Sequence, residues 1–160
     1  MKPSHIDEKG RARMVDVSAK AESEREAKAY GKVTLSREAY AAIKSGDGPK
    51  GDILTVAKIA GIMASKKTSE IVPLCHPLAI SAIDIRFEYR DRQRAIEVFS
   101  SVRCRARTGV EMEALAAVML ASLTIYDMCK ALDKSIQLGP FYLLEKSGGK
   151  SGGFRRQKAK

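Results

Sequence analysis

The sequence predicts one globular domain that combines apolar helices with antiparallel strands. Its 160 residues are enough for one domain with a sizeable core, and 44% hydrophobic and 30% charged residues are typical of a globular protein. Two long apolar stretches, 53–67 and 108–130, predict helices. Between them, residues 80–106 alternate apolar and polar side chains, as a β-hairpin does.

The first part of the chain contains short elements. In order they are a strand start at 14–17, a charged helix at 20–28, a strand at 30–35, and a short helix at 37–45 that Ser36 caps and Gly46 closes. In the helix at 20–28, the charged residues are expected to form a solvated face. We expect a single domain over 1–160, with 1–12 and 147–160 flexible.

A loop rich in glycine and proline, 46–52, precedes the first long helix. Its Asp52 can cap that helix, and its Lys50, next to a helix start, can meet an anionic group. The loop is not a P-loop, because GxxxxGK[ST] does not occur. Gly61, in the middle of the helix, costs about 1 kcal/mol relative to alanine, and close packing against another helix would explain it.

The segment 70–78 contains two prolines and is expected to be an irregular loop. It carries Cys75 and His76, which do not make a metal site, because a site needs three or four ligands and no second His or Cys pair is near. His76 can orient a substrate or pass a proton, or it can be a structural residue.

In the hairpin, the turn is expected at 91–94. Alternate residues of its second strand share an apolar face, and the opposite face carries Arg103, Arg105 and Arg107. These arginines form either a solvated face or a phosphate-binding row.

The stretch 108–130 is the most apolar part of the chain, with no charge from 114 to 126. A helix that is apolar on nearly every side is expected to be buried on nearly every side. Thr108 followed by Glu111 matches a capping box, and acidic residues in the first turn suit the helix dipole. The charge of Glu111 can therefore be explained by its place at the start of a helix, without a functional role.

Asp127 and Lys130 lie three residues apart at the other end of this helix and share one face. At a desolvated helix edge, a carboxylate and an amine can exchange protons and tune each other's pKa. The alternative is a surface ion pair worth about 0–1 kcal/mol.

The length of the helix constrains any site built from both of its ends. Glu113 and Asp127 lie about 21 Å apart along one helix axis, too far for one small pocket in one chain. A second, antiparallel copy of the helix would bring the two ends together, as a two-fold homodimer does. We therefore expect a site at a subunit interface.

A last strand is expected at 135–144, followed by a Gly-Ser-Lys tail. Lys146 and Lys150 in this tail can close over a polyphosphate, or the tail can be frayed. The net charge of +10 comes largely from here, since the last fifteen residues hold six Lys or Arg and no acid. A generic nucleic-acid binder would more often carry a basic stripe on its folded body.

Other composition features restrict the location and cofactors. No apolar run of about 18 residues predicts a membrane span, and the polar N-terminus predicts no secretory signal. Three cysteines without a CxxC pattern favour reduced thiols in the cytoplasm. GxGxxG is absent, so no nicotinamide or flavin site is expected.

Seven motifs, in this order, resemble one family: MVDVSAK, KGD, AGI, LCHPL, TGVEMEAL, TIYDMCKA and KSGGKSG. This is the MoaC family of cyclic pyranopterin monophosphate synthases, of molybdenum cofactor biosynthesis, and the resemblance runs from about 5 to 153. It implies a ferredoxin-like α+β fold, an antiparallel sheet with helices packed on one face. It also implies a homohexamer, a trimer of dimers with sites at the dimer interfaces.

The resemblance also implies a reaction: a cyclised dihydro-GTP is converted to cyclic pyranopterin monophosphate, and pyrophosphate is released. It implies Asp127 as the catalytic acid/base, with Lys130 beside it and Lys50 as a further functional lysine. The residues implied to line the substrate are Leu74, Cys75, His76, Met112 and Glu113, and His76 is also a catalytic candidate. The chain departs from many members at Arg107, which keeps a charge but leaves its role open.

The chemistry fits these residues. The rearrangement needs proton transfers but no redox change, and Lys146 and Lys150, with Lys50, Lys130 and some arginines, can neutralise a triphosphate. No cofactor is expected. Mg²⁺ could assist the pyrophosphate, but no dedicated carboxylate cluster is present. The competing hypotheses are a nucleic-acid or nucleotide-binding module and a structural assembly protein.

Overall fold

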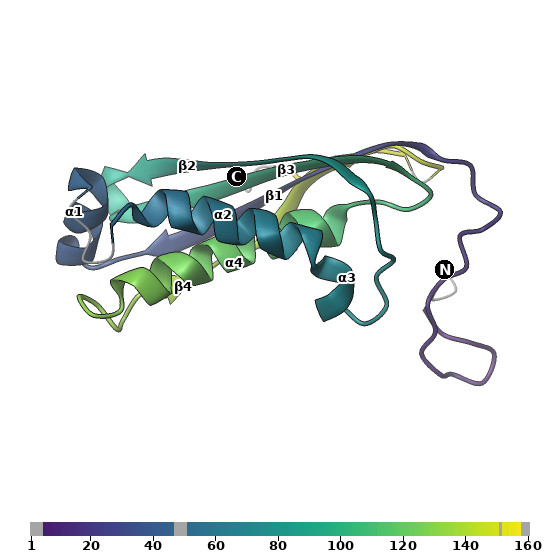
Figure 1. The fold of residues 1–160 in the computed structure, drawn as a ribbon, viewed down its shortest axis with the longest axis horizontal. Coiled ribbons are helices and arrows are strands. Elements are labelled where there is room, and N and C mark those ends of the chain that lie inside the picture. The colour runs from purple at the N-terminus through teal and green to yellow at the C-terminus, as the bar shows by residue number, and fades with distance from the viewer. Residues whose placement is uncertain (1–4, 47–50, 151, 158–160) are drawn as a thin grey trace.

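The computed structural model describes residues 5–46, 51–150 and 152–157. It has an antiparallel sheet covered on one face by helices (Figure 1). The strands are β1 (Ser23–Thr34), β2 (Ile80–Arg90), β3 (Ala95–Ala106), β4 (Gln137–Leu138), β5 (Tyr142–Ser147) and β6 (Phe154–Arg155). The helices are α1 (Arg37–Ser45), α2 (Ile53–Lys66), α3 (Thr68–Ile71) and α4 (Glu111–Cys129), with a 3₁₀ turn, η1 (Asp91–Gln93). The fold class expected from the sequence, α+β with helices on one face of an antiparallel sheet, is confirmed.

The sheet has the strand order β2-β3-β1-β5-β6, and β4 pairs with the end of β1. β1 pairs with β3 over its full length, from Ser23 opposite Ala106 to Thr34 opposite Ala95. The predicted hairpin is confirmed: β2 and β3 pair around a turn in which Arg94 adopts a positive φ of 47°. The β1–β3 pairing places the start of β1 beside the end of β3, and therefore near the start of α4.

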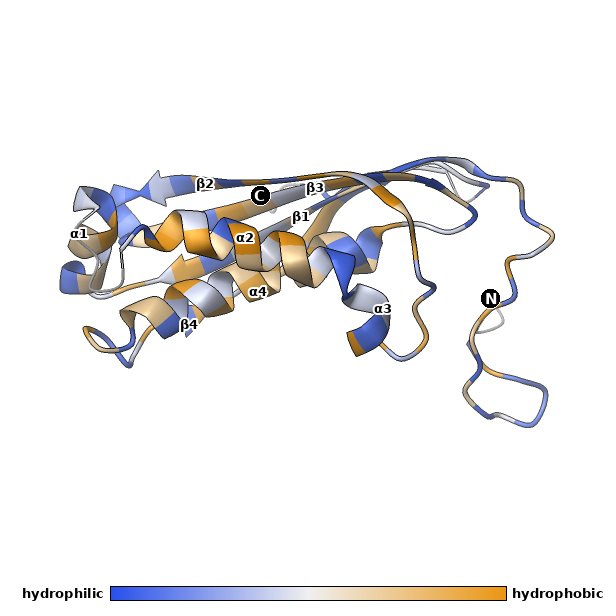
Figure 2. Cartoon of the chain, viewed as in Figure 1, coloured by the Kyte–Doolittle hydropathy of each residue, from blue (hydrophilic) through white to orange (hydrophobic). Residues whose placement is uncertain are grey.

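The core lies between the sheet and the helices α2 and α4. Alternate residues of β1 and β3 face it, and Val33, Val98 and Val102 are fully buried there. Gly61 lets α2 approach α4, because a Cβ at this position would lie 2.7 Å from the carbonyl oxygen of Ala117. The prediction that close helix packing explains Gly61 is therefore confirmed. In the cartoon of Figure 2, hydrophobic colours are frequent along α2 and recur in α4 and the strands, whereas α1 and the N-terminal segment contain many hydrophilic residues.

The opposite face of the sheet carries a small aromatic and charged layer. Tyr30 is stacked on Tyr142 with ring centroids 4.8 Å apart, and its edge contact with Phe99 has a centroid distance of 5.4 Å. The Tyr30 hydroxyl donates to Glu97, with an oxygen–oxygen distance of 2.9 Å. These contacts bury Tyr30, which is only 8% exposed, on the side of the sheet that the helices do not cover.

Two predictions for the N-terminal region are wrong. Most of the segment expected to be a charged helix, 20–28, lies in β1. Its small residues, Ala27 and Ala29, face the core, and the intervening charged residues pair across strands, as Lys28 does with Glu145. The segment 14–17 forms no strand and runs alongside the loop that contains His76.

The predicted side-chain caps of α1 and α2 are confirmed, and the predicted capping box of α4 is wrong. Ser36 Oγ accepts from Ala39 N at 3.2 Å, and an Asp52 carboxylate oxygen accepts from Thr55 N at 3.0 Å. The helix α4 instead begins at Glu111 with Val110 in the capping position and no side-chain cap.

The C-terminal part is more ordered than one strand and a tail. The expected strand at 135–144 is split by Gly139 and Pro140 into β4 and β5. The chain then forms a glycine-rich turn and returns as β6, which pairs with β5. The flexibility expected for 1–12 and 147–160 stays a prediction.

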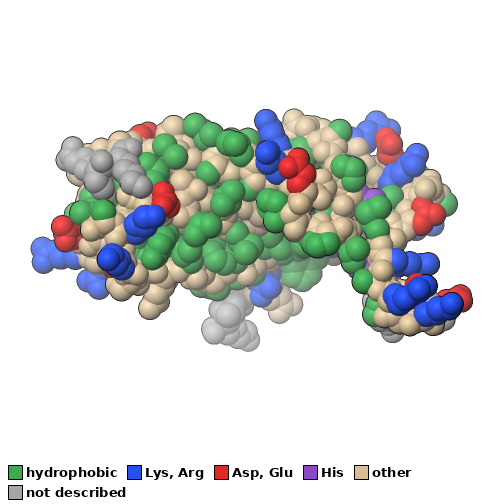
Figure 3. Space-filling view, turned by 60° about the horizontal axis from the view of Figure 1, so that its bottom comes forward, with side chains coloured by type: hydrophobic (Ala, Val, Ile, Leu, Met, Phe, Trp, Pro, Cys, Tyr) green, Lys and Arg blue, Asp and Glu red, His purple; other side chains and the backbone are tan. Residues whose placement is uncertain are grey.

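The helix α4 is buried on one side only, so the prediction of burial on nearly every side is wrong for the single chain. Met119 is 50% and Leu123 49% exposed, and on α2 Ile59 and Met63 are each 54% exposed. Figure 3 shows hydrophobic side chains gathered on this face of the molecule. By length and composition α4 could cross a membrane, but it packs against α2, β1 and β3 as a core helix does.

Candidate active site

A small cavity of about 260 Å³ lies at the N-terminal end of α4. It is bounded by the loop after α3, the start of α4 and the N-terminal segment of the chain. The structure brings together here all five side chains that the resemblance implied as substrate-lining, which are Leu74, Cys75, His76, Met112 and Glu113. The loop geometry follows from its two prolines, which keep 72–78 out of regular structure after α3 ends.

Glu113 is the buried acid of this cavity. Its side chain sits in the first turn of α4, and the residue is only 4% exposed. Burial raises the pKa of its carboxyl above the ordinary value, and the negative charge of nearby Glu111 adds to the increase. Burial, and then the charge of Glu113, raise the pKa of the Cys75 thiol. These surroundings therefore favour the protonated carboxyl of Glu113 and the neutral thiol of Cys75.

His76 is held by the N-terminal segment. Its Nε2 lies 2.8 Å from the carbonyl oxygen of Val15, a residue 61 positions earlier in the chain. Val15 and Val17 also line the cavity, so the segment that was expected to be a strand forms one of its sides.

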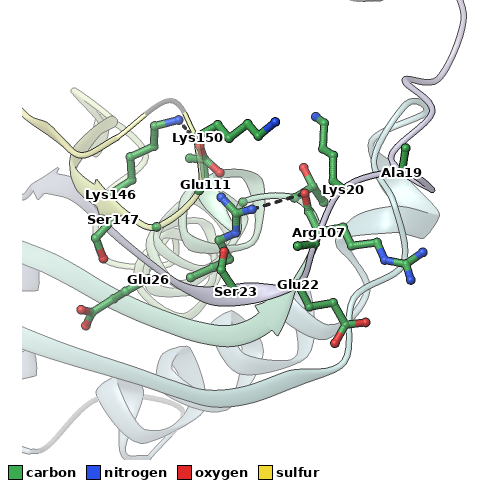
Figure 4. Close-up of a pocket in the computed structure, with 16 residues that line it drawn as sticks. Ala19, Lys20, Glu22, Ser23, Glu26, Arg107, Glu111, Lys146, Ser147 and Lys150 are labelled. Carbon is green, nitrogen blue, oxygen red and sulfur yellow. Dashed lines mark hydrogen bonds and ion pairs between the residues drawn. The ribbon is translucent and has the colours of Figure 1, made fainter.

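A second, larger cavity of about 630 Å³ adjoins the first one (Figure 4). The two share Lys20, Thr108, Gly109 and Glu111. The basic residues that line the larger cavity are Lys20, Arg25, Arg107, Lys146 and Lys150. In Figure 4, Lys20 and Lys150 extend toward each other across the cavity, while Glu22 and Glu26 point away from it. The cavity is therefore basic and is suited to an anion with several charges.

Arg25 lines this cavity and contacts two of the segments around it. Its Nε donates to the carbonyl oxygen of Ala106 at 3.3 Å, and its Nη2 donates to that of Arg107 at 3.4 Å. The glycine turn lies directly on the guanidinium group, because a Cβ on Gly149 would overlap Arg25 Nη1, and Gly149 has a φ of 80° that disfavours other residues. Arg25 therefore connects the end of β3 to the turn that carries Lys150.

The predicted pair Asp127–Lys130 forms, but at the opposite end of α4 and in neither cavity. The Lys130 Nζ lies 2.6 Å from Asp127 Oδ1, and this hydrogen bond raises the pKa of Lys130. The side chains of Asp127 and Lys130 are 55% and 52% exposed, so the expected desolvated edge is wrong for the single chain. Lys50 lies outside the described residues.

The arginine row of β3 divides into two parts. Arg103 stands directly opposite Glu26, and Arg105 opposite Glu24, across the β1–β3 ladder. Opposite charges at such positions are ordinary cross-strand pairs on an exposed sheet face. Arg107, beyond the end of β3, lines the basic cavity.

Sequence reasoning missed Lys20 and Arg25 as residues of the site. Both were assigned to a solvated helix face, and the structure places both in the basic cavity. The alternation of the small residues Ala27, Ala29 and Gly31 was the signal of a strand that could have corrected this assignment. In the part of the chain that the structure describes, no three His, Cys, Asp or Glu residues come together in a way that could hold a metal ion.

Comparison with known proteins adds a family to this geometry. The sequence model described as the MoaC family matches residues 14–149. Three similar proteins bear the name cyclic pyranopterin monophosphate synthase. One from Desulfitobacterium hafniense is 54% identical over 98% of this chain and 96% of its own. Those from Heliobacterium modesticaldum and Bacillus subtilis are 50% and 49% identical over 96% of this chain, and over 97% and 92% of their own.

Proposed function

The chain belongs to the MoaC family, and we propose that it catalyses the formation of cyclic pyranopterin monophosphate in molybdenum cofactor biosynthesis. The substrate is a cyclised dihydro-GTP, 3′,8-cyclo-7,8-dihydroguanosine triphosphate, and pyrophosphate is released. The enzyme is a lyase, and the rearrangement involves no redox change.

The observation that carries this proposal is the pair of adjoining cavities. The basic one offers five cationic side chains, enough to neutralise a triphosphate and to stabilise the leaving pyrophosphate. The smaller one offers a buried carboxyl and an imidazole beside apolar groups, as a pterin ring with several exchangeable protons requires. Substrate spanning both would place its phosphates and its ring where each finds complementary groups.

Within the site, Lys146 and Lys150 bind phosphate oxygens together with Lys20 and Arg25. Glu113 and His76 act on the ring system, where burial favours the protonated form of Glu113, the form that can donate a proton. Leu74, Cys75 and Met112 surround the ring. Lys50 is assigned a further cationic role on the resemblance alone.

Asp127 and Lys130 enter the site from a second copy of the chain. In this dimer two α4 helices run antiparallel, and Asp127 of each copy approaches Glu113 of the other. The exposed face formed by Ile59, Met63, Met119 and Leu123 supports such contact, since side chains of this size are seldom left together in solvent. Association would also desolvate the Asp127–Lys130 pair, which proton transfer requires. Three such dimers form the proposed hexamer.

The remaining assignments rest on the composition and the family. We assign no resident cofactor, and Mg²⁺ enters only with the pyrophosphate. The enzyme is assigned to the cytoplasm, with no nucleic-acid or membrane partner.

The test is direct. Purified protein is incubated with the cyclised dihydro-GTP, and pyrophosphate is measured together with the pterin product by chromatography. Stoichiometric release of both is expected. Consumption of substrate without a cyclic pyranopterin phosphate, or binding without turnover, would contradict the proposal.

A further inference from the structure

The hydrogen bond between His76 and Val15 determines which imidazole nitrogen carries a proton. A backbone carbonyl oxygen can only accept, so Nε2 of His76 must be the donor in the 2.8 Å contact. In the neutral imidazole, Nδ1 is then unprotonated, and it is the nitrogen that can accept a proton.

The carbonyl of Val15 is held in place by its own segment. Asp16, the next residue, accepts two hydrogen bonds from Ser18, one from its backbone N at 2.8 Å and one from its Oγ at 2.6 Å. Lys20 N then donates to Val17 O at 3.0 Å and closes a turn. These bonds restrict the backbone on the C-terminal side of Val15.

The same segment contributes to both cavities. Val15 and Val17 line the smaller one, and Lys20, at the end of the turn, lines both. One short, internally bonded piece of chain therefore contacts His76 and lines both cavities.

We propose that the segment 15–20 is a positioning element for the reaction, in which the Val15 carbonyl fixes the tautomer and the ring orientation of His76. This inference rests on the proposed function for its catalytic meaning. When one nitrogen of an imidazole is hydrogen-bonded, the ring is fixed and its other nitrogen faces in one direction as a base. Catalytic and metal-binding histidines are commonly oriented in this way by a neighbouring residue. Val15 touches His76 and acts through it.

The test uses nuclear magnetic resonance of ligand-free protein, so its result does not depend on turnover. The chain has two histidines, and His5→Gln leaves His76 as the only imidazole. With ¹⁵N-labelled histidine, the variant is expected to show a proton on Nε2 that exchanges slowly with water, and an unprotonated Nδ1. A proton on Nδ1, or rapid exchange at both nitrogens, would overturn the proposal.

Two further variants test the role of the segment. Deletion of residues 1–17 removes His5 together with the Val15 carbonyl, and the slow Nε2 proton of His76 is expected to disappear. Deletion of residues 1–9 retains Val15 and serves as the control, with the signal expected to persist. Asp16→Ala keeps the chain length and covers the case in which the long deletion does not fold. It should accelerate exchange of the Nε2 proton at least severalfold, and an unchanged rate would contradict the proposed positioning.

Kinetic measurements test the positioning role of segment 15–20 separately from the proposed synthase activity. In the enzyme assay, Asp16→Ala is expected to lower kcat more than it raises KM, because the base is misdirected while phosphate binding is retained. If the wild-type chain has no synthase activity, the proposed function fails while the tautomer result stands. If the chain is active and Asp16→Ala has wild-type kcat, positioning by this segment fails alone.

Discussion

Lys146 Nζ lies 2.7 Å from Glu111 Oε1, and the two residues are 35 positions apart in the sequence. The contact joins β5 to the first turn of α4 at the boundary between the two cavities. Both side chains are partly buried, at 30% and 23% exposed. Glu111 therefore holds a cation at the place where the basic cavity and the smaller cavity meet.

Replacing this lysine tests the phosphate role. Lys146→Ala is expected to weaken triphosphate binding by roughly tenfold to a hundredfold, the loss of one charge-assisted contact of about 1.5–3 kcal/mol. Isothermal calorimetry with the substrate and with a dephosphorylated analogue measures the difference. Lys44→Ala, which also loses a lysine–carboxylate pair but on α1, is the matched control and should bind normally. Equal losses for both ligands would contradict a phosphate role.

Asp127→Asn should separate catalysis from stability. The pair with Lys130 is about half exposed in the single chain, so the substitution should change the melting temperature of that chain little. Turnover should fall by roughly 10²–10⁴, the usual scale for a general acid–base group. Thermal unfolding and steady-state kinetics on the same sample give both quantities. Near-normal product formation would remove Asp127 from the mechanism.

Mixed assemblies test the shared site. Chains carrying Asp127→Asn and chains carrying Glu113→Gln are each expected to be inactive alone, because every site contains the altered residue. After coexpression, half the dimers are mixed, and one of their two sites has both native residues. About a quarter of wild-type activity should therefore return.

The control for this experiment uses two changes at one end of the helix. Coexpressed Asp127→Asn and Lys130→Ala chains leave every site with one defect, so no activity should return. No recovery in the first mixture would show that each site is built within a single chain. Recovery in the control would show that the Asp127 and Lys130 of one site come from different chains.

Glu113 makes a stability prediction with a definite sign. Burial raises its pKa in the folded state above the unfolded value. Between those two values the folded chain binds more protons, so the free energy of unfolding falls as pH rises through this window. Glu113→Gln is expected to raise the melting temperature at pH values above this window, and the gain should shrink as pH is lowered through it. The exposed Glu24, changed to Gln, is the control, and an unchanged or lower melting temperature for Glu113→Gln would contradict the assignment.

Arg156, which follows β6, is expected to hold this strand against β5. Its Nε donates to Leu143 O at 3.0 Å, and its guanidinium lies 4.6 Å from the centroid of the Tyr142 ring. Arg156→Ala should loosen β6 and raise KM by roughly two- to tenfold, from a loss of about 0.5–1.5 kcal/mol. Arg155→Ala is the matched control, because that side chain is 87% exposed and its nearest carboxylate lies 3.8 Å away. Equal effects of the two changes would indicate a simple loss of charge.

Features set by neighbouring residues were predictable from the sequence. Ser36 and Asp52 cap their helices as expected, because a cap depends on backbone groups three residues away. The alternation in 80–106 was long enough to define the hairpin. The motif resemblance grouped Leu74, Cys75, His76, Met112 and Glu113, and the structure places all five around one cavity. Nothing in their spacing required the loop at 74–76 to meet the start of α4. Their role toward a substrate stays a prediction.

Features that depend on distant partners were not predictable in this way. The small residues of β1 take their inward positions only because β3, some 70 residues later, pairs with them. Lys20 and Arg25 therefore had no visible reason to join a site. Glu111 looked like half of a capping box, but its carboxylate instead pairs with Lys146 from β5. The outer face of α4 is exposed in the single chain. Its composition is as apolar as that of the buried face, so the sequence alone could not distinguish the two faces.

The hydrogen bond from His76 to Val15 has a practical consequence for anyone who produces this enzyme. An affinity tag or a fusion partner placed ahead of residue 1 is attached to a segment that lines the smaller cavity fifteen residues later. Kinetic constants of tagged material should therefore be compared with those of protein from which the added sequence has been cleaved.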